Sequence, residues 1–276
     1  MKINYIDMKI FRLSVLLFVL SYTTMYATNK KIDTLGVVFE CDTISHKAKV
    51  SKVYGKSSHL IVPQYVKDEN GESYEVISLG YGALGDSRIK RLKITLPHSI
   101  LRIGSGAFHD NENLQLLSVE QSVTYISSLA FGNCISLEQL NLKSVNYIGK
   151  QAFSKCESLK DLHFLNSVRE IGDEAFYECK SLKYFNMPDC LYEIGEGAFM
   201  NCTSLLSVRF SNTIHIIREN TFRNCQSLTE IYLPENIKRI RRGAFYNCSN
   251  LKKVRVSKNC LIDDYVFPEN TVIEFY

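Results

Sequence analysis

Cysteine is the residue type whose number and spacing would support chemistry in this chain of 276 residues. The chain has nine cysteines, and thiols can form disulfides, bind zinc or act as nucleophiles. No C-x-x-C spacing occurs, so zinc binding has little support. Six cysteines recur 22 or 23 residues apart and three do not. The regular six are Cys134, Cys156, Cys179, Cys202, Cys225 and Cys248, and the irregular three are Cys41, Cys190 and Cys260.

The six histidines are scattered without the spacing of metal ligands. The chain also lacks the G-x-S-x-G, H-E-x-x-H, P-loop and dinucleotide-binding motifs. We therefore expect no catalytic residues, no metal site, no cofactor and no enzyme activity. A catalytic dyad assembled across distant segments would leave no such motif, so enzyme activity stays open as the least favoured alternative.

A repeated segment surrounds the regular cysteines. It has the pattern I-G-x-x-A-F-x-x-C-x-S-L-x-x-ϕ-x-ϕ, where ϕ is an apolar residue, and Ile171–Met187 is a complete copy. A fixed period in the twenties is typical of a solenoid, in which stacked coils bury a shared core. Degenerate copies flank the array at Leu84 and Phe267. The register is marked by Phe108, Phe131, Phe153, Phe176, Phe199, Phe222 and Phe245.

Each repeat has three predicted parts. The ϕ-x-ϕ pair alternates with period two and predicts a short strand with one buried face, as at Leu162 and Phe164. The glycine of the I-G pair, such as Gly149 or Gly172, predicts a positive φ or a close backbone turn. The A-F-x-x-C segment predicts a helical or 3₁₀ turn.

The repeat register also guides the interpretation of the cysteines. Each regular cysteine follows a phenylalanine by three residues, and Asn111 occupies the same slot in an earlier copy. Parallel side chains on stacked coils do not favour disulfide geometry. We therefore expect a ladder of buried thiols that pack as small apolar groups, with disulfides or a metal site as alternatives. Among the irregular cysteines, Cys190 is expected to be the exposed thiol.

Residues 1–27 have the pattern of a cleaved signal peptide. Lys2, Lys9 and Arg12 supply positive charge, and the apolar run Leu13–Leu20 follows. The run is too short to span a bilayer, and no transmembrane segment is expected in the mature chain. The sequence therefore predicts a secreted or cell-surface protein.

The mature chain is expected to have two parts. Residues 28–75 predict a polar linker, Thr28–Lys31, followed by a β unit whose hairpin spans Leu35–Val53. Such a unit would cap the stack, because a terminal repeat otherwise exposes its apolar face. Residues 76–276 predict the repeats, ending in a degenerate copy.

The repeat resembles the BspA-like leucine-rich repeat family, and the front segments GVVFE and AKVSKV resemble the β cap of such arrays. The resemblance covers roughly Gly36 to Tyr276. It implies a right-handed solenoid of the α/β type, with a parallel β-sheet on one face and short helical or 3₁₀ turns. It also implies secretion or surface display and, for some members, binding to host matrix proteins or to other cells. No catalytic residues are associated with the family.

Outward positions of the predicted strands are the candidate partner-binding residues. Side chains that flank the buried ϕ residue face solvent, and tyrosine and arginine are frequent in binding hot spots. The alternative is an ordinary solvated sheet face. The site predicted for an extracellular protein comprises Asp161, His163, Tyr184, Asn186, Arg209, Glu230, Tyr232 and Arg255.

A second candidate site is a basic patch near the C-terminal end of the stack. The net charge of +4 is too mild to indicate nucleic-acid binding. A local positive patch would attract an acidic glycan or an acidic protein surface, whereas its alternative role is to discourage edge-to-edge pairing. The patch comprises Lys238, Arg239, Arg241, Arg242, Lys252 and Lys253.

Overall fold

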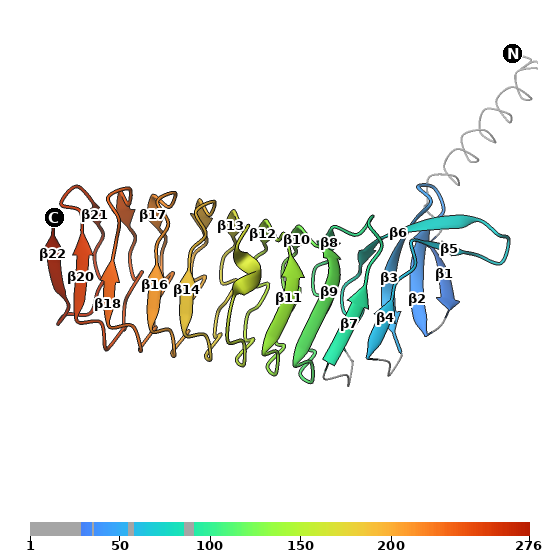
Figure 1. The fold of residues 1–276 in the computed structure, drawn as a ribbon, viewed down its shortest axis with the longest axis horizontal. Helices are drawn as coiled ribbons and strands as arrows, with labels where there is room; N and C mark the ends of the chain where they lie inside the picture. The colour runs from blue at the N-terminus through green and yellow to red at the C-terminus, as the bar shows by residue number, and fades with distance from the viewer. Residues whose placement is uncertain (1–28, 35, 55–57, 86–90) are drawn as a thin grey trace, which may run out of the picture.

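A computed structural model describes residues 29–34, 36–54, 58–85 and 91–276. It shows a long stack of coils with a small β unit at the N-terminal end (Figure 1). The signal peptide predicted for residues 1–27 lies outside the described residues. Within the described part of the chain, no helix is long and apolar enough to cross a membrane.

The N-terminal unit is a five-stranded sheet. The predicted hairpin is confirmed, because β2 and β3 pair antiparallel. The predicted linker is wrong, since Asn29–Thr34 forms a strand that pairs with β2 and satisfies the hydrogen-bonding groups of its edge. The sheet order is β1 (Asn29–Thr34), β2 (Val37–Asp42), β3 (Lys47–Val53), β6 (Ser73–Leu79) and β5 (Tyr65–Lys67).

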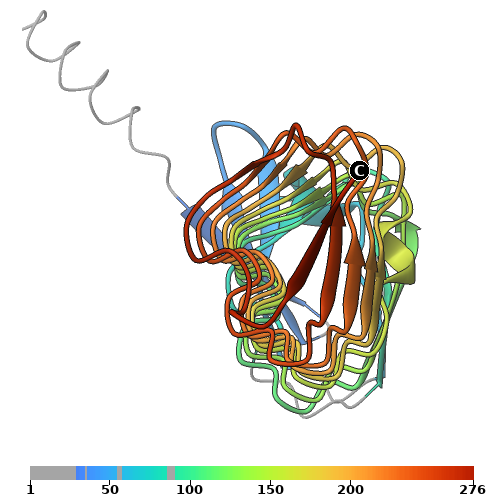
Figure 2. The same cartoon turned by 90° about the vertical axis from the view of Figure 1, so that its left-hand side faces the viewer.

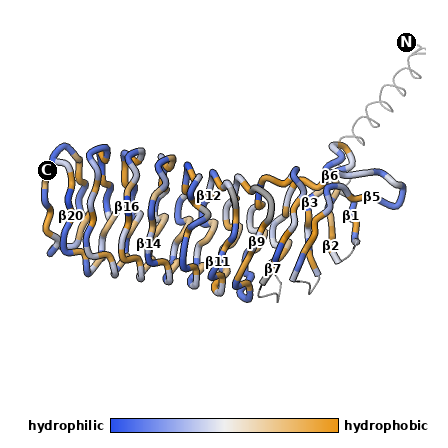
Figure 3. The backbone as a smooth tube through the Cα atoms, viewed as in Figure 1, coloured by the Kyte–Doolittle hydropathy of each residue, from blue (hydrophilic) through white to orange (hydrophobic). Residues whose placement is uncertain are grey.

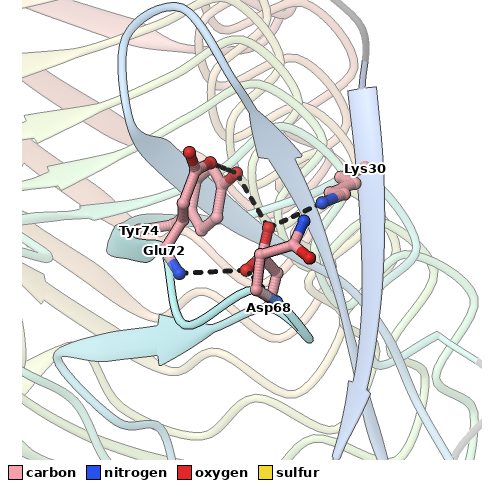
Figure 4. A network of polar contacts seen from close by, with 5 residues as sticks. Lys30, Asp68, Glu72 and Tyr74 are labelled. Atoms are coloured by element: carbon pink, nitrogen blue, oxygen red, sulfur yellow. Dashed lines mark hydrogen bonds and ion pairs between the residues drawn. The ribbon is translucent and has the colours of Figure 1, made fainter.

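A polar network ties β1 to the turn before β6 (Figure 4). Lys30 Nζ lies 2.6 Å from Asp68 Oδ2, and the hydroxyl of buried Tyr74 donates to Glu72 Oε2 at 2.9 Å. The hydrogen bond from Lys30 lowers the pKa of Asp68, whereas burial and the Glu72 carboxylate raise the pKa of Tyr74 to about 12. These contacts hold the end strand against the sheet whose buried residues join the core of the stack.

Most coils place one strand on a long face, which we call the sheet face. Neighbouring strands pair in parallel with equivalent repeat positions side by side, as in Phe185 against Val208. This confirms the predicted ϕ-x-ϕ strands in most coils. The strands are β4 (His59–Ile61), β7 (Arg91–Thr95), β9 (Leu116–Ser122), β11 (Gln139–Lys143), β14 (Tyr184–Asn186), β16 (Ser207–Arg209), β18 (Glu230–Tyr232), β20 (Lys253–Val256) and β22 (Val272–Phe275).

One coil interrupts the sheet face. The strand predicted at Leu162 and Phe164 is wrong, because His163–Leu165 forms the 3₁₀ helix η1 between β11 and β14 (Figure 1). The N–H of Leu165 donates to the carbonyl of Leu162 at 2.9 Å, and both side chains are buried. Apolar residues three apart suit a 3₁₀ turn, so this coil buries Leu162 and Leu165 where the other coils use alternate residues.

A second line of parallel strands, which we call the second sheet, runs along another side of the coils in two segments, and the sequence patterns did not predict it. Each of its strands has two residues, the second of which is an isoleucine that faces the core. Figure 2, viewed along the stack, shows strands on separate sides of the coils. These strands are β8 (Arg102–Ile103), β10 (Tyr125–Ile126), β12 (Tyr147–Ile148), β13 (Glu170–Ile171), β15 (Glu193–Ile194), β17 (Ile216–Ile217), β19 (Arg239–Ile240) and β21 (Leu261–Ile262).

Stacked phenylalanines form the centre of the core. The rings of Phe153 and Phe176 lie 5.2 Å apart between centroids, with planes inclined by 1°. The degenerate copies continue the stack, since Leu84 is buried and the ring of Phe267 lies 5.5 Å from that of Phe245. Apolar and polar residues alternate along the coils (Figure 3), which keeps this core covered. The predicted solenoid is therefore confirmed.

The turn around each phenylalanine differs from the prediction. Residues two before and two after the phenylalanine have positive φ, as at Glu174 (φ 53°) and Glu178 (φ 57°), and the segment forms turns instead of a helix. Left-handed residues interrupt a right-handed helix, which explains the failure of the helical-turn prediction. Gly172 does not have positive φ, but a Cβ there would lie 2.7 Å from the backbone nitrogen of Lys150. Its close backbone approach is therefore confirmed.

The regular cysteines form the predicted buried ladder of free thiols. Each Sγ lies near the carbonyl oxygen of the phenylalanine one coil earlier, as in Cys179 and Phe153 at 3.3 Å. Asn111 makes the equivalent bond, donating from Nδ2 to the carbonyl of Leu84 at 2.8 Å. This repeat position therefore holds a small hydrogen-bond donor. Cysteine suits it because the side chain is small and largely apolar but still has a weak S–H donor. Cys190 is exposed, as predicted.

Candidate partner-binding face

The middle of the sheet face brings several predicted partner-binding residues together. Parallel pairing of β14 with β16 places Asn186 beside Arg209, and both side chains are exposed. Tyr184 is 56% exposed on the same side of β14. Because residues at alternate strand positions share one face, these three side chains point away from the core together.

The C-terminal part of the sheet face carries the remaining predicted residues. Parallel pairing of β18 with β20 places Glu230 beside Lys253 and Tyr232 beside Arg255. Tyr232 is 55% exposed and stacks on the ring of Tyr276, with centroids 5.7 Å apart. This aromatic pair presents a rigid surface with little conformational entropy to lose on binding.

Arg255 and Lys253 already have partners within the chain. Glu274 on β22 lies 2.9 Å from Lys253 Nζ and 3.7 Å from Arg255 Nε. The guanidinium of Arg255 also lies over the rings of Tyr232 and Tyr276, 5.5 and 5.8 Å from their centroids. Arg209 has no ion-pair partner among the described residues and is the freer cation on this face.

Asp161 and His163 are separated from the other candidates by the change in backbone. His163 begins η1, and the carboxylate of Asp161 accepts a hydrogen bond from its N–H at 3.4 Å. The two residues therefore do not continue the line of outward strand positions. His163 is exposed and Asp161 is half-buried.

The six residues of the basic patch lie on two different sheets. Lys238, Arg239, Arg241 and Arg242 surround β19 in the second sheet, whereas Lys252 and Lys253 lie at β20 in the sheet face. Asp263 lies 2.9 Å from Arg239 and 3.9 Å from Arg241, which neutralises part of the first group. Exposed pairs of this kind add little stability, but they lower the local positive potential.

A third feature, which the sequence patterns did not indicate, lies on the turns around the phenylalanines. A hollow of about 460 Å³ is lined by side chains of the last coils. A sequence signal for this hollow does exist, because Arg223 and Tyr246 each directly follow a phenylalanine of the repeat and so lie at equivalent positions of successive coils. The lining residues are Glu219, Asn220, Arg223, Arg242, Gly243, Tyr246 and Tyr265.

The described part of the chain has no group of three or more histidine, cysteine or acidic side chains arranged to hold a metal ion. The regular thiols are also poorly suited to nucleophilic chemistry. Burial raises the pKa of Cys202 to about 12, so its reactive thiolate is scarce at neutral pH. The exposed sheet face and the hollow are two places where a ligand can reach the described part of the chain.

Comparisons with known proteins agree with this architecture. The model of the BspA type leucine rich repeat region matches in six copies, over residues 78–205 and 170–275. No curated protein matches the chain.

Two solved structures have similar folds. A leucine-rich repeat protein from Bacteroides ovatus is 25% identical, with a TM-score of 0.63, and the match covers 88% of this chain but 57% of that one. The T. pallidum leucine-rich repeat protein is 24% identical, with a TM-score of 0.55, over 80% of this chain and 91% of that one. The repeat, the stacked core and the family model, which matches over residues 78–205 and 170–275, show that the chain belongs to the BspA-type leucine-rich repeat family.

Proposed function

We propose that the protein is a secreted or cell-surface protein that binds an extracellular protein through the sheet face. The proposal rests on one observation: Tyr184, Arg209 and Tyr232 are exposed on β14, β16 and β18, the sheet-face strands of three successive coils. Tyrosine and arginine contribute disproportionately to binding energy at protein interfaces. Since the regular thiols are buried in the core and burial raises the pKa of Cys202 to about 12, binding is favoured over catalysis.

The rigid scaffold supports this proposal energetically. Each of these strands is fixed by its pairing with neighbours and by a buried central residue, such as Phe185 or Val208. Their outward side chains are therefore positioned before a partner arrives, which reduces the entropy lost on association. A protein partner from the host matrix or from a neighbouring cell would meet an extended surface of suitable chemistry.

The test replaces Tyr184, Arg209 and Tyr232 with alanine in one variant. Its binding to a panel of purified matrix proteins is measured by biolayer interferometry beside that of the unaltered protein. Each hot-spot residue contributes about 2 kcal/mol, so the triple variant is expected to lose at least about a hundredfold in affinity. The circular dichroism spectrum and thermal midpoint should change little, because all three side chains are exposed.

The matched control replaces Gln139 and Asn141 with alanine. These exposed residues occupy the equivalent positions of β11 on the other side of η1. Their replacement is expected to leave affinity unchanged. If a matrix protein binds and the triple variant retains that affinity while folded, the assignment of the binding site is refuted; if no panel protein binds, the matrix-protein proposal is refuted.

A further inference from the structure

The hollow on the phenylalanine turns has the form of a small ligand site. Its volume of about 460 Å³ falls in the range of pockets that hold small molecules. Gly243 forms part of its lining, with φ of 70° and no side chain, between Asn220 in the previous coil and Tyr265 in the next. A Cβ at Gly243 would lie 2.5 Å from Asn220 Oδ1, so the absence of a side chain here lets the Asn220 amide lie against the backbone of the next coil.

Two arginine–tyrosine pairs line the hollow. The guanidinium carbon of Arg223 lies 5.0 Å from the ring centroid of Tyr246, and that of Arg242 lies 5.4 Å from the centroid of Tyr265. Cation–π contacts at this distance hold a guanidinium in place while leaving its N–H groups available. Arg223 Nη1 donates to Asn220 Oδ1 at 3.3 Å, and neither arginine has an ion-pair partner among the described residues.

The side chains that line the hollow indicate which chemical groups a ligand should carry. Two guanidinium groups favour a carboxylate, which they can bind through charge-assisted hydrogen bonds. Tyr246 and Tyr265 are 43% and 69% exposed and offer apolar ring surface beside those charges. Glu219 adds a carboxylate to the same lining, and a carboxylate accepts hydrogen bonds from hydroxyl groups such as those of a sugar.

We propose that this hollow binds a sugar acid of the uronic-acid class, within an acidic glycan. Arg223 and Arg242 bind the sugar carboxylate, the tyrosine rings pack against the C–H face of the sugar, and Glu219 and Asn220 bind its hydroxyl groups. The site uses turn residues and shares none of the sheet-face residues, so it is independent of the proposed protein binding. Of its lining residues, the basic patch includes Arg242 alone.

The probe is a galacturonic acid trimer, with its methyl ester and the neutral galactose trimer as matched controls. Binding to the full protein is measured by isothermal titration calorimetry at low and physiological salt. The acid form is expected to bind at least tenfold more tightly than either control and to weaken as salt rises. Equal binding of the acid and its methyl ester, or no binding of the acid, would overturn the proposal.

Two kinds of variant locate the site. Arg223→Gln and Arg242→Gln each remove a guanidinium and are expected to weaken binding at least about tenfold, the effect of one lost charge-assisted hydrogen bond. Gly243→Asn fills the hollow with a residue type that tolerates positive φ, and a similar loss is expected. Retained affinity in these folded variants would refute the assignment.

Arg209→Gln is the control, because it removes an arginine from the sheet face. It is expected to leave binding of the trimer unchanged, whereas Arg223→Gln should leave binding of a matrix protein unchanged. The two sites can therefore fail separately. Loss of trimer binding in Arg209→Gln would place the sugar on the sheet face and overturn the inference.

Discussion

Replacing Phe176 with alanine tests whether the stacked phenylalanines hold the array together. The ring has no exposed surface, and it lies 5.2 Å from both Phe153 and Phe199, measured between centroids. The backbone bond from the Phe176 N–H to the carbonyl of Ala198, 2.8 Å long, does not involve the side chain. The substitution therefore removes core packing while leaving this link between coils available.

The expected loss in the free energy of unfolding is about 3–5 kcal/mol, the usual effect of removing a buried phenylalanine ring. Part of that loss comes from two ring contacts, each worth about 0.5–1.5 kcal/mol beyond area burial. Phe267 provides the comparison, since it is only half-buried and Phe245 is its one stacking partner among the residues that the structure describes. With less burial and one stacking partner, Phe267→Ala is expected to lose about 1–2 kcal/mol.

Urea unfolding followed by circular dichroism measures both variants. Because each coil is coupled mainly to its neighbours, the middle substitution should also lower the m-value if the array separates into two cooperative units. The end substitution should shift the midpoint with an unchanged m-value. Equal losses at the two positions, or a loss below about 1 kcal/mol at Phe176, would show that the stack does not carry the stability assigned to it.

Three further outcomes are expected. Asn111 Oδ1 is buried without a hydrogen-bond partner among the described residues, so Asn111→Cys should raise the free energy of unfolding by about 1 kcal/mol, measured with urea. A lower free energy of unfolding would contradict the conclusion that this position needs only a small hydrogen-bond donor. At pH 8, a thiol reagent should modify Cys190 first, as peptide mass spectrometry would show, because Cys190 is exposed. Burial raises the pKa of Cys202 from 9.0 to about 12, so the folded state retains its proton longer and stability should fall as pH rises through this window. The variant Cys202→Ala should show a weaker dependence of stability on pH. An unchanged dependence would contradict burial of the Cys202 thiol as its cause.

Much of the fold could be predicted from the sequence because the repeat is local and regular. Phe176, Cys179 and Leu182 recur at fixed distances, and any stack that buries one copy must bury the others. The burial of the regular thiols followed from the same register. The periodicity and the free-energy cost of exposing apolar surface are sufficient to predict both features.

The structure differs from the predictions where several backbone conformations would bury the same apolar side chains. Leu162 was correctly expected in the core, but Leu165, three positions later, is buried with it, and that spacing suits the observed 3₁₀ helix instead of the predicted strand. Likewise, the close contact at Gly172 was anticipated, while the positive φ lay at Glu174 and Glu178 instead. A glutamate gives no sequence signal for a left-handed conformation, which stacking imposes here.

The candidate sites were harder to predict because they depend on which coils meet and on which side. Alternation along each strand predicted the exposure of Tyr184 and Tyr232. The basic residues were close in sequence, yet β19 and β20 place them in different sheets. The hollow requires Arg223, Gly243 and Tyr265 from three successive coils, and no single repeat contains it.

The sequence by itself determined the period, the buried ladders and the family, because these follow from residue types repeated at a fixed spacing. Only the tertiary structure decided the second sheet, the interruption at η1, the separation of the basic residues and the hollow lined in part by Gly243. The physical reason is that burial constrains which side chains point inward, whereas the conformation of the turns and the neighbours of outward side chains depend on how successive coils contact one another.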